Sequence, residues 1–184
     1  MNAKHMWICL FLVFYSAQSP CTACTWITSQ YRILSRECLS QLQKMGGEFS
    51  QVYKPFPTSL YTRIITAKTE NQVRFLAEVT EQITELFNVN LDSAKWDSGA
   101  LDNFLNILNT RMLNELKNCA ASYRETKEQR HTNMTLKKHF RKLKRILKKA
   151  NYSADSWEQI RRLVRNHLTR MDIIASNLKS ALTG

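Results

Sequence analysis

Between Trp157 and Ala181 the chain reads WEQIRRLVRNHLTRMDIIASNLKSA. Apolar side chains recur in this stretch every three or four residues, which is the period of one face of an α-helix. A helix with one apolar face must bury that face against other elements, so the stretch predicts a long helix in a packed core. The positions on this face are Trp157, Ile160, Val164, His167, Met171, Ile174, Leu178 and Ala181.

Four further segments repeat this apolar spacing upstream. The first is Ile27–Met45, which ends before Gly46-Gly47, and the others are Val73–Phe87, Leu101–Cys119 and Leu136–Ala150. Gly and Pro number only 4 and 3, and no stretch alternates apolar and polar residues as a half-buried strand would. The sequence therefore predicts an all-α fold, a bundle of five helices.

The connections between these segments are long and polar. Thr69 with Gln72, and Asp155 with Glu158, have the spacing of capping boxes at the start of the second and last helices. Long connections permit the crossovers of cytokine-type bundles. We expect loops at Glu48–Ser59, Asn88–Gly99 and Ser122–Thr132, and one or two helical turns at Leu60–Ile65.

The first 23 residues have a different character from the rest of the chain. Lys4 precedes an apolar run, Met6–Tyr15, and small residues follow up to Ala23. A basic tip, a short apolar run and small residues before a cut are typical of a secretory signal peptide. We therefore expect residues 1–23 to be removed and residues 24–184 to form one secreted, extracellular domain. A buried N-terminal helix is the alternative.

Removal of this leader leaves three cysteines in the mature protein, Cys24, Cys38 and Cys119. In an oxidising compartment an odd number of cysteines predicts one disulfide and one free thiol. The residue spacing alone does not say which two of the three are joined.

Positive charge is concentrated in the C-terminal part of the chain. There are 27 Lys and Arg against 15 Asp and Glu, a net charge of +12. Residues 117–184 hold 17 of these basic side chains and only 5 of the acidic ones. The helix expected at Leu136–Ala150 has a continuous basic face formed by Lys137, Lys138, Arg141, Lys142, Arg145, Lys148 and Lys149.

This basic face has several interpretations. It is either a solvated helix face without a ligand or a binding surface for an anionic partner. The anionic partners to consider are a heparan-type polysaccharide, an acidic receptor surface, nucleic acid and a membrane. The secretory leader argues against nucleic acid, and the regular apolar side of this helix favours a place in the core.

No pattern of a catalytic or cofactor site occurs in the sequence. His131, His139 and His167 lack the spacing of a zinc site. Glycine-rich phosphate loops and nucleophile elbows are also absent. We therefore expect no enzyme activity, no cofactor and no metal.

Two N-glycosylation sequons occur, Asn133-Met134-Thr135 and Asn151-Tyr152-Ser153. They predict glycans on Asn133 and Asn151, at the two ends of the basic helix, which agrees with secretion. For Asn133 the alternative is a helix N-cap.

Several separate segments carry a family resemblance. They are Cys24-Thr25-Trp26, Leu34–Leu39, Met45–Glu48, Phe56–Tyr61, Gln72–Leu76, Leu101–Leu108 and the run from His139 to Glu158. Together they resemble fish type I interferons of the two-cysteine group, a family of helical cytokines.

The resemblance implies a disulfide between Cys24 and Cys119. Many type I interferons have a second disulfide whose cysteine precedes Ala-Trp-Glu, but this chain has Asp155-Ser156-Trp157-Glu158 there. Cys38 is additional, and its place on the apolar stripe of the first helix predicts a buried free thiol.

The resemblance also implies a signalling function. Members of the family are antiviral cytokines that bind two different class II cytokine receptor chains and trigger JAK-STAT signalling and antiviral gene induction. One receptor chain meets the first helix, the loop after it and the last helix, whereas the other meets the opposite face. The protein is expected to act as a monomer, without nucleic acid and without stable insertion in a membrane.

Three arginines of the last helix are the expected receptor contacts. In related interferons an Arg four residues after the Trp serves this role, and here that residue is Arg161. A second recurring Arg falls at Asn166, so Arg162 and Arg165 are its nearest substitutes. Helical spacing predicts that the three arginines form one exposed basic patch. The alternative function is a cationic amphipathic membrane-active or heparan-binding defence protein.

Overall fold

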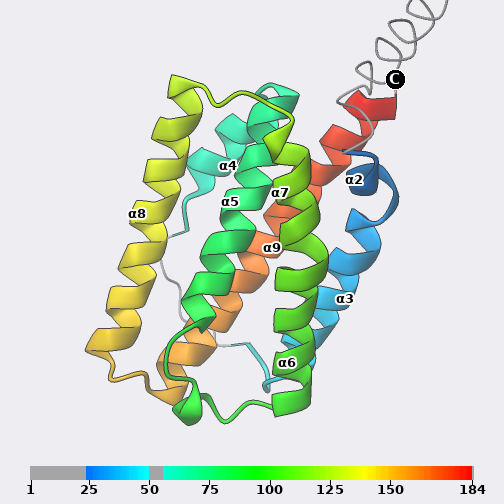
Figure 1. Cartoon of the computed structure of the whole chain (residues 1–184). Coiled ribbons are helices and arrows are strands. Elements are labelled where there is room, and N and C mark those ends of the chain that lie inside the picture. The colour runs from blue at the N-terminus through cyan, green and yellow to red at the C-terminus, as the bar shows by residue number, and fades with distance from the viewer. Residues whose placement is uncertain (1–23, 50–55, 184) are drawn as a thin grey trace, which may run out of the picture.

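The computed structural model describes residues 24–49 and 56–183, and within these ranges the chain is helical with no strand (Figure 1). The signal-peptide prediction for residues 1–23 and part of the Glu48–Ser59 loop lie outside the described residues. The helices are α2 (Thr25–Ser29), α3 (Tyr31–Lys44), α4 (Thr58–Ile65), α5 (Thr69–Phe87), α6 (Ser98–Asn106), α7 (Asn114–Ala121), α8 (Lys127–Lys149) and α9 (Ala154–Thr183), with a short 3-10 turn, η2 (Asp92–Ala94).

Two of the five predicted helices are not regular α-helices along their whole length. The first is divided at Gln30 into α2 and α3, whose backbones join at a bend. The third is one continuous rod in which a π-helical segment, η3 (Ile107–Leu113), connects α6 to α7. A π-helical segment has more residues per turn than an α-helix, which changes the residues that face the core. In this segment both Ile107 and Leu108 are buried.

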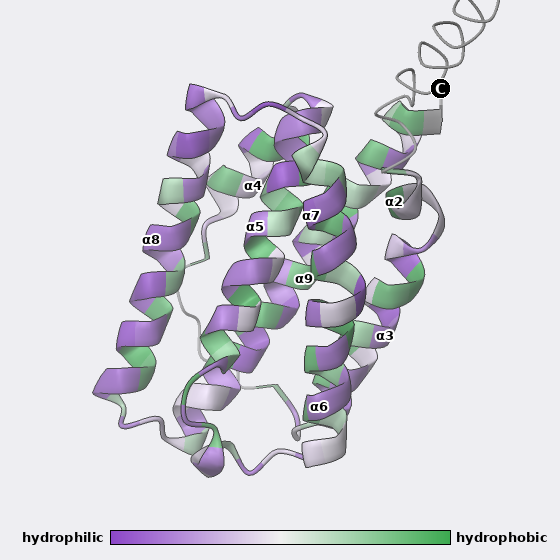
Figure 2. Ribbon diagram, viewed as in Figure 1, coloured by the Kyte–Doolittle hydropathy of each residue, from purple (hydrophilic) through white to green (hydrophobic). Residues whose placement is uncertain are grey.

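The helices form a bundle around α5 and α9. α5 packs against α7, α8 and α9, while α9 also packs against α2, α3 and α4. The buried residues are mostly apolar, and each helix ribbon carries both hydrophobic and hydrophilic residues along its length (Figure 2). The predicted apolar stripe of α9 is buried from Trp157, its largest side chain, to Leu178, whereas Ala181 at its end is exposed. The predicted all-helical cytokine-type bundle is confirmed.

Helix α8 begins earlier than the sequence predicted. The segment Ser122–Thr132 was expected to be a loop, but α8 starts at Lys127. The Thr126 side chain caps this end by accepting a hydrogen bond from the Gln129 backbone N–H. Because Gln129 and Thr132 are buried against the bundle, packing extends the helix into a polar sequence.

The two predicted capping boxes are wrong. Lys68 is the N-cap of α5, and the Gln72 side chain donates to the carbonyl oxygens of Ile65 and Ala67 instead. At the start of α9 the Ser153 hydroxyl accepts from the Ser156 N–H. The observed caps, Lys68 and Ser153, lie one and two residues before the predicted ones, so Thr69 and Asp155 lie inside the first turns of α5 and α9.

The cysteines are arranged as the family resemblance implied. Cys24 and Cys119 form a disulfide with Cα atoms 4.9 Å apart, so the start of α2 is tied to the end of α7. Cys38 is a free thiol, and its side chain is fully buried in the core. Both predictions are confirmed.

None of the helices in the described ranges has the length and apolar character that crossing a membrane requires.

Candidate functional site

Arg161 is the centre of the candidate site, but it is not an exposed residue. Its side chain is 0% exposed, whereas Arg162 is half-buried and Arg165 is exposed. The prediction of a single exposed patch of three arginines is therefore wrong in the case of Arg161. Arg161 follows Ile160 of the buried stripe, and the end of α3 packs over this side of α9.

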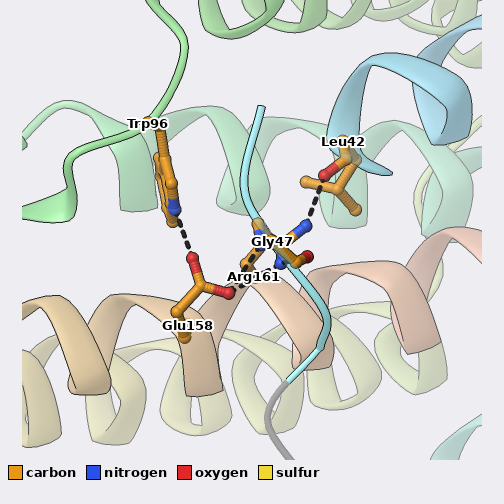
Figure 3. Close-up of polar contacts among 5 residues, drawn as sticks. All are labelled: Leu42, Gly47, Trp96, Glu158 and Arg161. Atoms are coloured by element: carbon orange, nitrogen blue, oxygen red, sulfur yellow. Dashed lines mark hydrogen bonds and ion pairs between the residues drawn. The ribbon is translucent and has the colours of Figure 1, made fainter. Parts of the chain in front are cut away.

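Hydrogen bonds explain how a guanidinium is accommodated inside the protein. Arg161 Nη1 donates to the Leu42 carbonyl oxygen over 2.8 Å, and Nη2 donates to the Gly47 carbonyl oxygen over 2.5 Å. Nε and Nη2 also donate to Glu158 Oε2 over 2.9 and 2.7 Å (Figure 3). A buried charge is costly unless it is paired and hydrogen-bonded, and here both conditions are met.

Glu158 extends this network to the connection before α6. Its Oε1 accepts a hydrogen bond of 2.5 Å from Trp96 Nε1, while its Oε2 binds Arg161 (Figure 3). The Trp96 ring packs edge-on against Trp157, with centroids 5.5 Å apart. We name Leu42, Gly47, Trp96, Glu158 and Arg161 the Arg161 cluster. It joins the end of α3, the loop after it, the loop before α6 and the first turns of α9.

Gly46 permits this close approach because it has no Cβ atom. A Cβ atom at Gly46 would lie 2.9 Å from Arg161 Cζ and from Glu158 Oε1, whereas at Gly47 it would meet nothing within 4 Å. The neighbouring Met45 carbonyl oxygen accepts from the Asp97 backbone N–H over 2.8 Å. The Gly46-Gly47 pair therefore does more than end the first helix, because its first glycine lets the backbone lie against α9.

Phe49 connects the buried arginine to the surface. The Arg161 guanidinium carbon lies 4.1 Å from the centre of the Phe49 ring, and that of Arg165 lies 4.8 Å from it. Such cation–π contacts hold the ring and the guanidinium groups together. The loop that follows α3 is thus fixed to α9 as far as Phe49, with Arg165 exposed beside it.

Sequence reasoning missed Trp96, Phe49 and the role of Glu158. Trp96 and Phe49 lie in predicted loops, far along the chain from Arg161, so no local spacing relates them to it. One signal was available, since a Gly-Gly pair marks a place where the backbone can approach another element closely.

A second polar network is buried between α4, α8 and α9. Tyr61 Oη and His167 Nδ1 are 2.6 Å apart, and His167 Nε2 lies 3.2 Å from His139 Nε2. Burial raises the pKa of Tyr61, lowers the pKa of His139 to about 4 and lowers the pKa of His167 well below its usual value. Tyr61 is therefore a hydrogen-bond donor and both histidines are neutral, as expected for a structural network.

The basic face predicted on α8 is present as a surface. Its seven predicted residues are all exposed, while the apolar side of the same helix is buried in the bundle. Lys137 pairs with Glu78 over 3.4 Å and Lys144 pairs with Glu85 over 3.4 Å, both on α5. Leu136, Phe140 and Leu147 are core residues, so the apolar side of α8 is packed inside the bundle.

The two sequons differ in their surroundings. Asn151 is exposed, in the left-handed region with φ of 48°, in the turn after α8. Asn133 is half-buried inside α8, and its Oδ1 has no hydrogen-bond partner. Asn133 is therefore not the N-cap of α8, a role that belongs to Thr126. In the described ranges no three His, Cys, Asp or Glu side chains meet at a possible metal position.

Comparisons with known proteins agree with this architecture. A family model described as the interferon alpha/beta domain matches residues 27–178. Interferon a3 of Oncorhynchus mykiss is 42% identical over 181 residues, which is 97% of this chain and 99% of the trout protein. Interferon type A1/A2 of Gallus gallus is 21% identical over 176 residues, which is 93% of this chain and 91% of the chicken protein.

A solved structure is similar as well. Zebrafish interferon 1 superposes with a TM-score of 0.79 at 44% sequence identity, covering 84% of this chain and 99% of the zebrafish chain. Sequence and fold thus agree over nearly the whole described domain. The chain belongs to the interferon alpha/beta family as a type I interferon of the kind found in fish, a signalling cytokine that acts through cytokine receptor chains and is not an enzyme.

Proposed function

We propose that this interferon is secreted after removal of residues 1–23 and binds two different class II cytokine receptor chains as a monomer. The bound pair of chains triggers JAK-STAT signalling and antiviral gene induction. Family membership supports the proposal, and so does the arrangement of α9, which carries Arg162 and Arg165 beside the loop start that the Arg161 cluster holds.

The fixed position of the start of the loop after α3, from Gly46 to Phe49, is the observation that carries this proposal. A binding loop that is already fixed loses little conformational entropy when a partner docks. The Arg161 cluster and the Phe49 ring hold the first residues of this loop, as far as Phe49, against α9. Arg165 and Arg162 are then direct contacts for receptor carboxylates, which an Arg binds through two parallel hydrogen bonds. Arg161 contributes by positioning the loop.

Receptor dependence is the test of this function. Cells that carry an interferon-responsive reporter are treated with residues 24–184, with each receptor chain present or deleted in turn. Induction that requires both chains supports the proposal, and induction in cells lacking both chains contradicts it. The variant Arg165→Ala should bind at least one receptor ectodomain at least 5-fold more weakly, because a central arginine contact contributes about 1–3 kcal/mol.

Binding to a heparan-type polysaccharide is a second proposal, carried by the exposed basic face of α8. Seven exposed basic side chains on one helix attract a polyanion, and salt weakens this attraction. We expect the protein to elute from a heparin column at high salt, and the triple variant Lys138→Glu, Arg141→Glu, Arg145→Glu to elute much earlier. Equal elution of both proteins would contradict this proposal without affecting the receptor proposal.

We also propose N-linked glycans, with Asn151 as the better-supported site and Asn133 as the other. Exposure and the turn after α8 leave room for a glycan on Asn151. Protein secreted from eukaryotic cells should shift in mobility after glycosidase treatment, and Asn151→Gln should reduce that shift. If the wild-type protein shows no shift, the proposal is contradicted.

A further inference from the structure

A polar hollow lies between α5, α8 and the connection that precedes α8. Its volume is about 530 Å³, which is within the range of small-ligand sites. Helix α5 contributes Glu78 to its lining, and the connection contributes Glu125. The other lining residues belong to the first half of α8 and are Lys127, Arg130, Asn133, Met134 and Lys137. We name this site the Asn133 hollow; it lies where α8 packs beside α5 (Figure 1).

Two acceptor oxygens that line the Asn133 hollow have no hydrogen-bond donor. Asn133 Oδ1 and Glu78 Oε1 are both buried, and neither has a hydrogen-bond partner in the described part of the chain. Lys137 Nζ forms an ion pair with Glu78 Oε1 over 3.4 Å. Glu78 as a whole is only 9% exposed. Because buried polar atoms of native proteins are nearly always satisfied, the two oxygens favour a ligand that donates hydrogen bonds.

The charges of the hollow favour a neutral ligand. Three basic side chains of α8 line it together with two carboxyl groups, those of Glu78 and Glu125, so the positive and negative charges nearly balance. Hydroxyl groups both donate and accept hydrogen bonds, so they can pair with either kind of side chain. Met134, which is 60% exposed, adds an apolar surface. A sugar residue, with its hydroxyl groups and apolar C–H faces, matches this mixture better than a polyanion does.

The chain itself carries an attachment point for such a sugar. Asn133 is the acceptor of the sequon Asn133-Met134-Thr135. Glycan transfer joins Asn133 Nδ2 to the anomeric carbon of an oligosaccharide, while one amide proton and the diphosphate of the lipid-linked donor leave. A glycan attached in this way begins at the wall of the hollow.

The folded protein does not offer this sequon freely. Asn133 is half-buried inside α8, and the Thr135 hydroxyl donates a hydrogen bond of 3.0 Å to the His131 carbonyl oxygen. Transfer to Asn133 therefore has to precede the folding of α8. When α8 then packs against α5, the attached sugar is brought to the hollow.

We propose that the Asn133 hollow is a carbohydrate subsite occupied by the first sugars of a glycan on Asn133. The sugar hydroxyls supply donors to the unpartnered oxygens, and an apolar face of the sugar covers Met134. The glycan thereby links α8 to α5, whereas a glycan on the exposed Asn151 projects into solvent. This inference rests on the proposed glycosylation and gives one of its two sites a structural role.

Variants that keep one sequon each provide a matched comparison. Secreted from eukaryotic cells, Asn151→Gln retains only the Asn133 glycan, and Asn133→Gln retains only the Asn151 glycan. A peptide glycosidase acting on the native protein should release the Asn133 glycan about tenfold more slowly, because cleavage at a covered bond requires local opening. After denaturation the two glycans should be released at equal rates.

Thermal unfolding shows whether the Asn133 glycan stabilises the fold. Glycosylated Asn151→Gln should unfold about 2–4 °C above the same variant produced without glycans in bacteria, because the sugar satisfies buried oxygens. For Asn133→Gln, the glycosylated and unglycosylated forms should unfold at the same temperature.

Glu78→Ala and Glu85→Ala separate a contact in the hollow from the loss of a charge. Both glutamates lie on α5 and pair with a lysine of α8 over 3.4 Å, but of the two only Glu78 lines the hollow. Added to Asn151→Gln, Glu78→Ala should speed the release of the Asn133 glycan from native protein severalfold. Glu85→Ala should leave the rate unchanged. Equal rates for the two variants would overturn the proposed contact.

The remaining outcomes separate this inference from the proposed glycosylation. If both sites carry glycans and native protein releases them equally fast, the Asn133 glycan projects into solvent, so the hollow proposal is overturned and glycosylation stands. If only Asn151 carries a glycan, the hollow proposal alone is overturned. If neither site is modified, both proposals fail.

Discussion

The guanidinium of Arg161 donates a hydrogen bond to the carbonyl oxygen of Gly47, so α9 holds the start of the loop that follows α3. The two residues are separated by 114 positions in the sequence. A side chain that belongs by its helical position near a surface thus becomes part of the interior. Because of this contact, the first residues of the loop, as far as Phe49, are held in place beside the exposed face of α9.

Loss of the Arg161 side chain should destabilise the fold. In Arg161→Ala the partly buried Glu158 carboxylate keeps the Trp96 donor but loses its cation, and the carbonyl groups of Leu42 and Gly47 lose the guanidinium donor. Breaking a comparable buried pair costs about 3–5 kcal/mol. Urea unfolding measures the change in the free energy of unfolding. Arg165→Ala is the control, because this exposed substitution should change stability by about 0.5 kcal/mol or less. If Arg161→Ala is as stable as the wild-type protein, the buried network is not formed in solution.

The two neighbouring glycines should respond differently to substitution. Gly46→Ala brings a Cβ atom within 2.9 Å of Arg161 Cζ, and Gly47→Ala meets no atom within 4 Å. Overpacking of this kind costs about 1–3 kcal/mol, so only Gly46→Ala should lower the midpoint of thermal unfolding clearly. Equal midpoints for the two variants would contradict the close approach at Gly46.

The buried histidines should make stability fall in mild acid. Burial lowers the pKa of His139 to about 4 and that of His167 further below its usual value. The unfolded chain titrates its histidines near pH ~6.5 and binds more protons below it, so acid favours unfolding. The contribution of the two neutral histidines to the free energy of unfolding is therefore fully present above pH ~6.5. It is lost as the pH falls towards about 4, by at most ~1.4 kcal/mol per pH unit for each proton.

Variants isolate this effect from other titrating groups. Burial raises the pKa of Asp172 and of Glu78, and these carboxyl groups oppose the histidines because the folded state keeps their protons. The contributions of Asp172 and Glu78 are present in both His139→Gln and the wild-type protein, so they cancel when the two proteins are compared. Urea unfolding at several pH values should give a shallower slope for His139→Gln, whereas the exposed His131→Gln should keep the wild-type slope. Identical slopes for all three proteins would be the contrary result.

The state of the free Cys38 thiol can be checked by alkylation followed by mass spectrometry. Burial raises the pKa of the Cys38 thiol, so the native protein should resist alkylation and take up one label only after unfolding without reductant. Rapid labelling of the native protein would show that Cys38 is accessible.

Removal of the Cys24–Cys119 disulfide by a double Ser variant should cost about 4–5 kcal/mol of the free energy of unfolding, because the bridge closes a loop spanning a separation of 95 residues.

The amino-acid sequence by itself determined the helices and the faces they bury. Apolar periodicity depends only on local spacing, and the stripe from Trp157 to Leu178 is buried as it predicted. The burial of Cys38 followed from the same spacing, because this residue lies on the apolar side of the first helix. The disulfide pairing required the family resemblance in addition, since three cysteines allow more than one pair.

Only the tertiary structure decided which polar residues become interior. The periodicity of α9 gives Arg161 a boundary position, and its burial depends on carbonyl groups of α3 and the following loop that arrive from far along the chain. Likewise, α8 extends back to Lys127, where Gln129 and Thr132 pack against the bundle and are buried. A hydrogen-bonding partner supplied by another element has no signature in the local sequence, so the position of such a residue is fixed only when the helices pack.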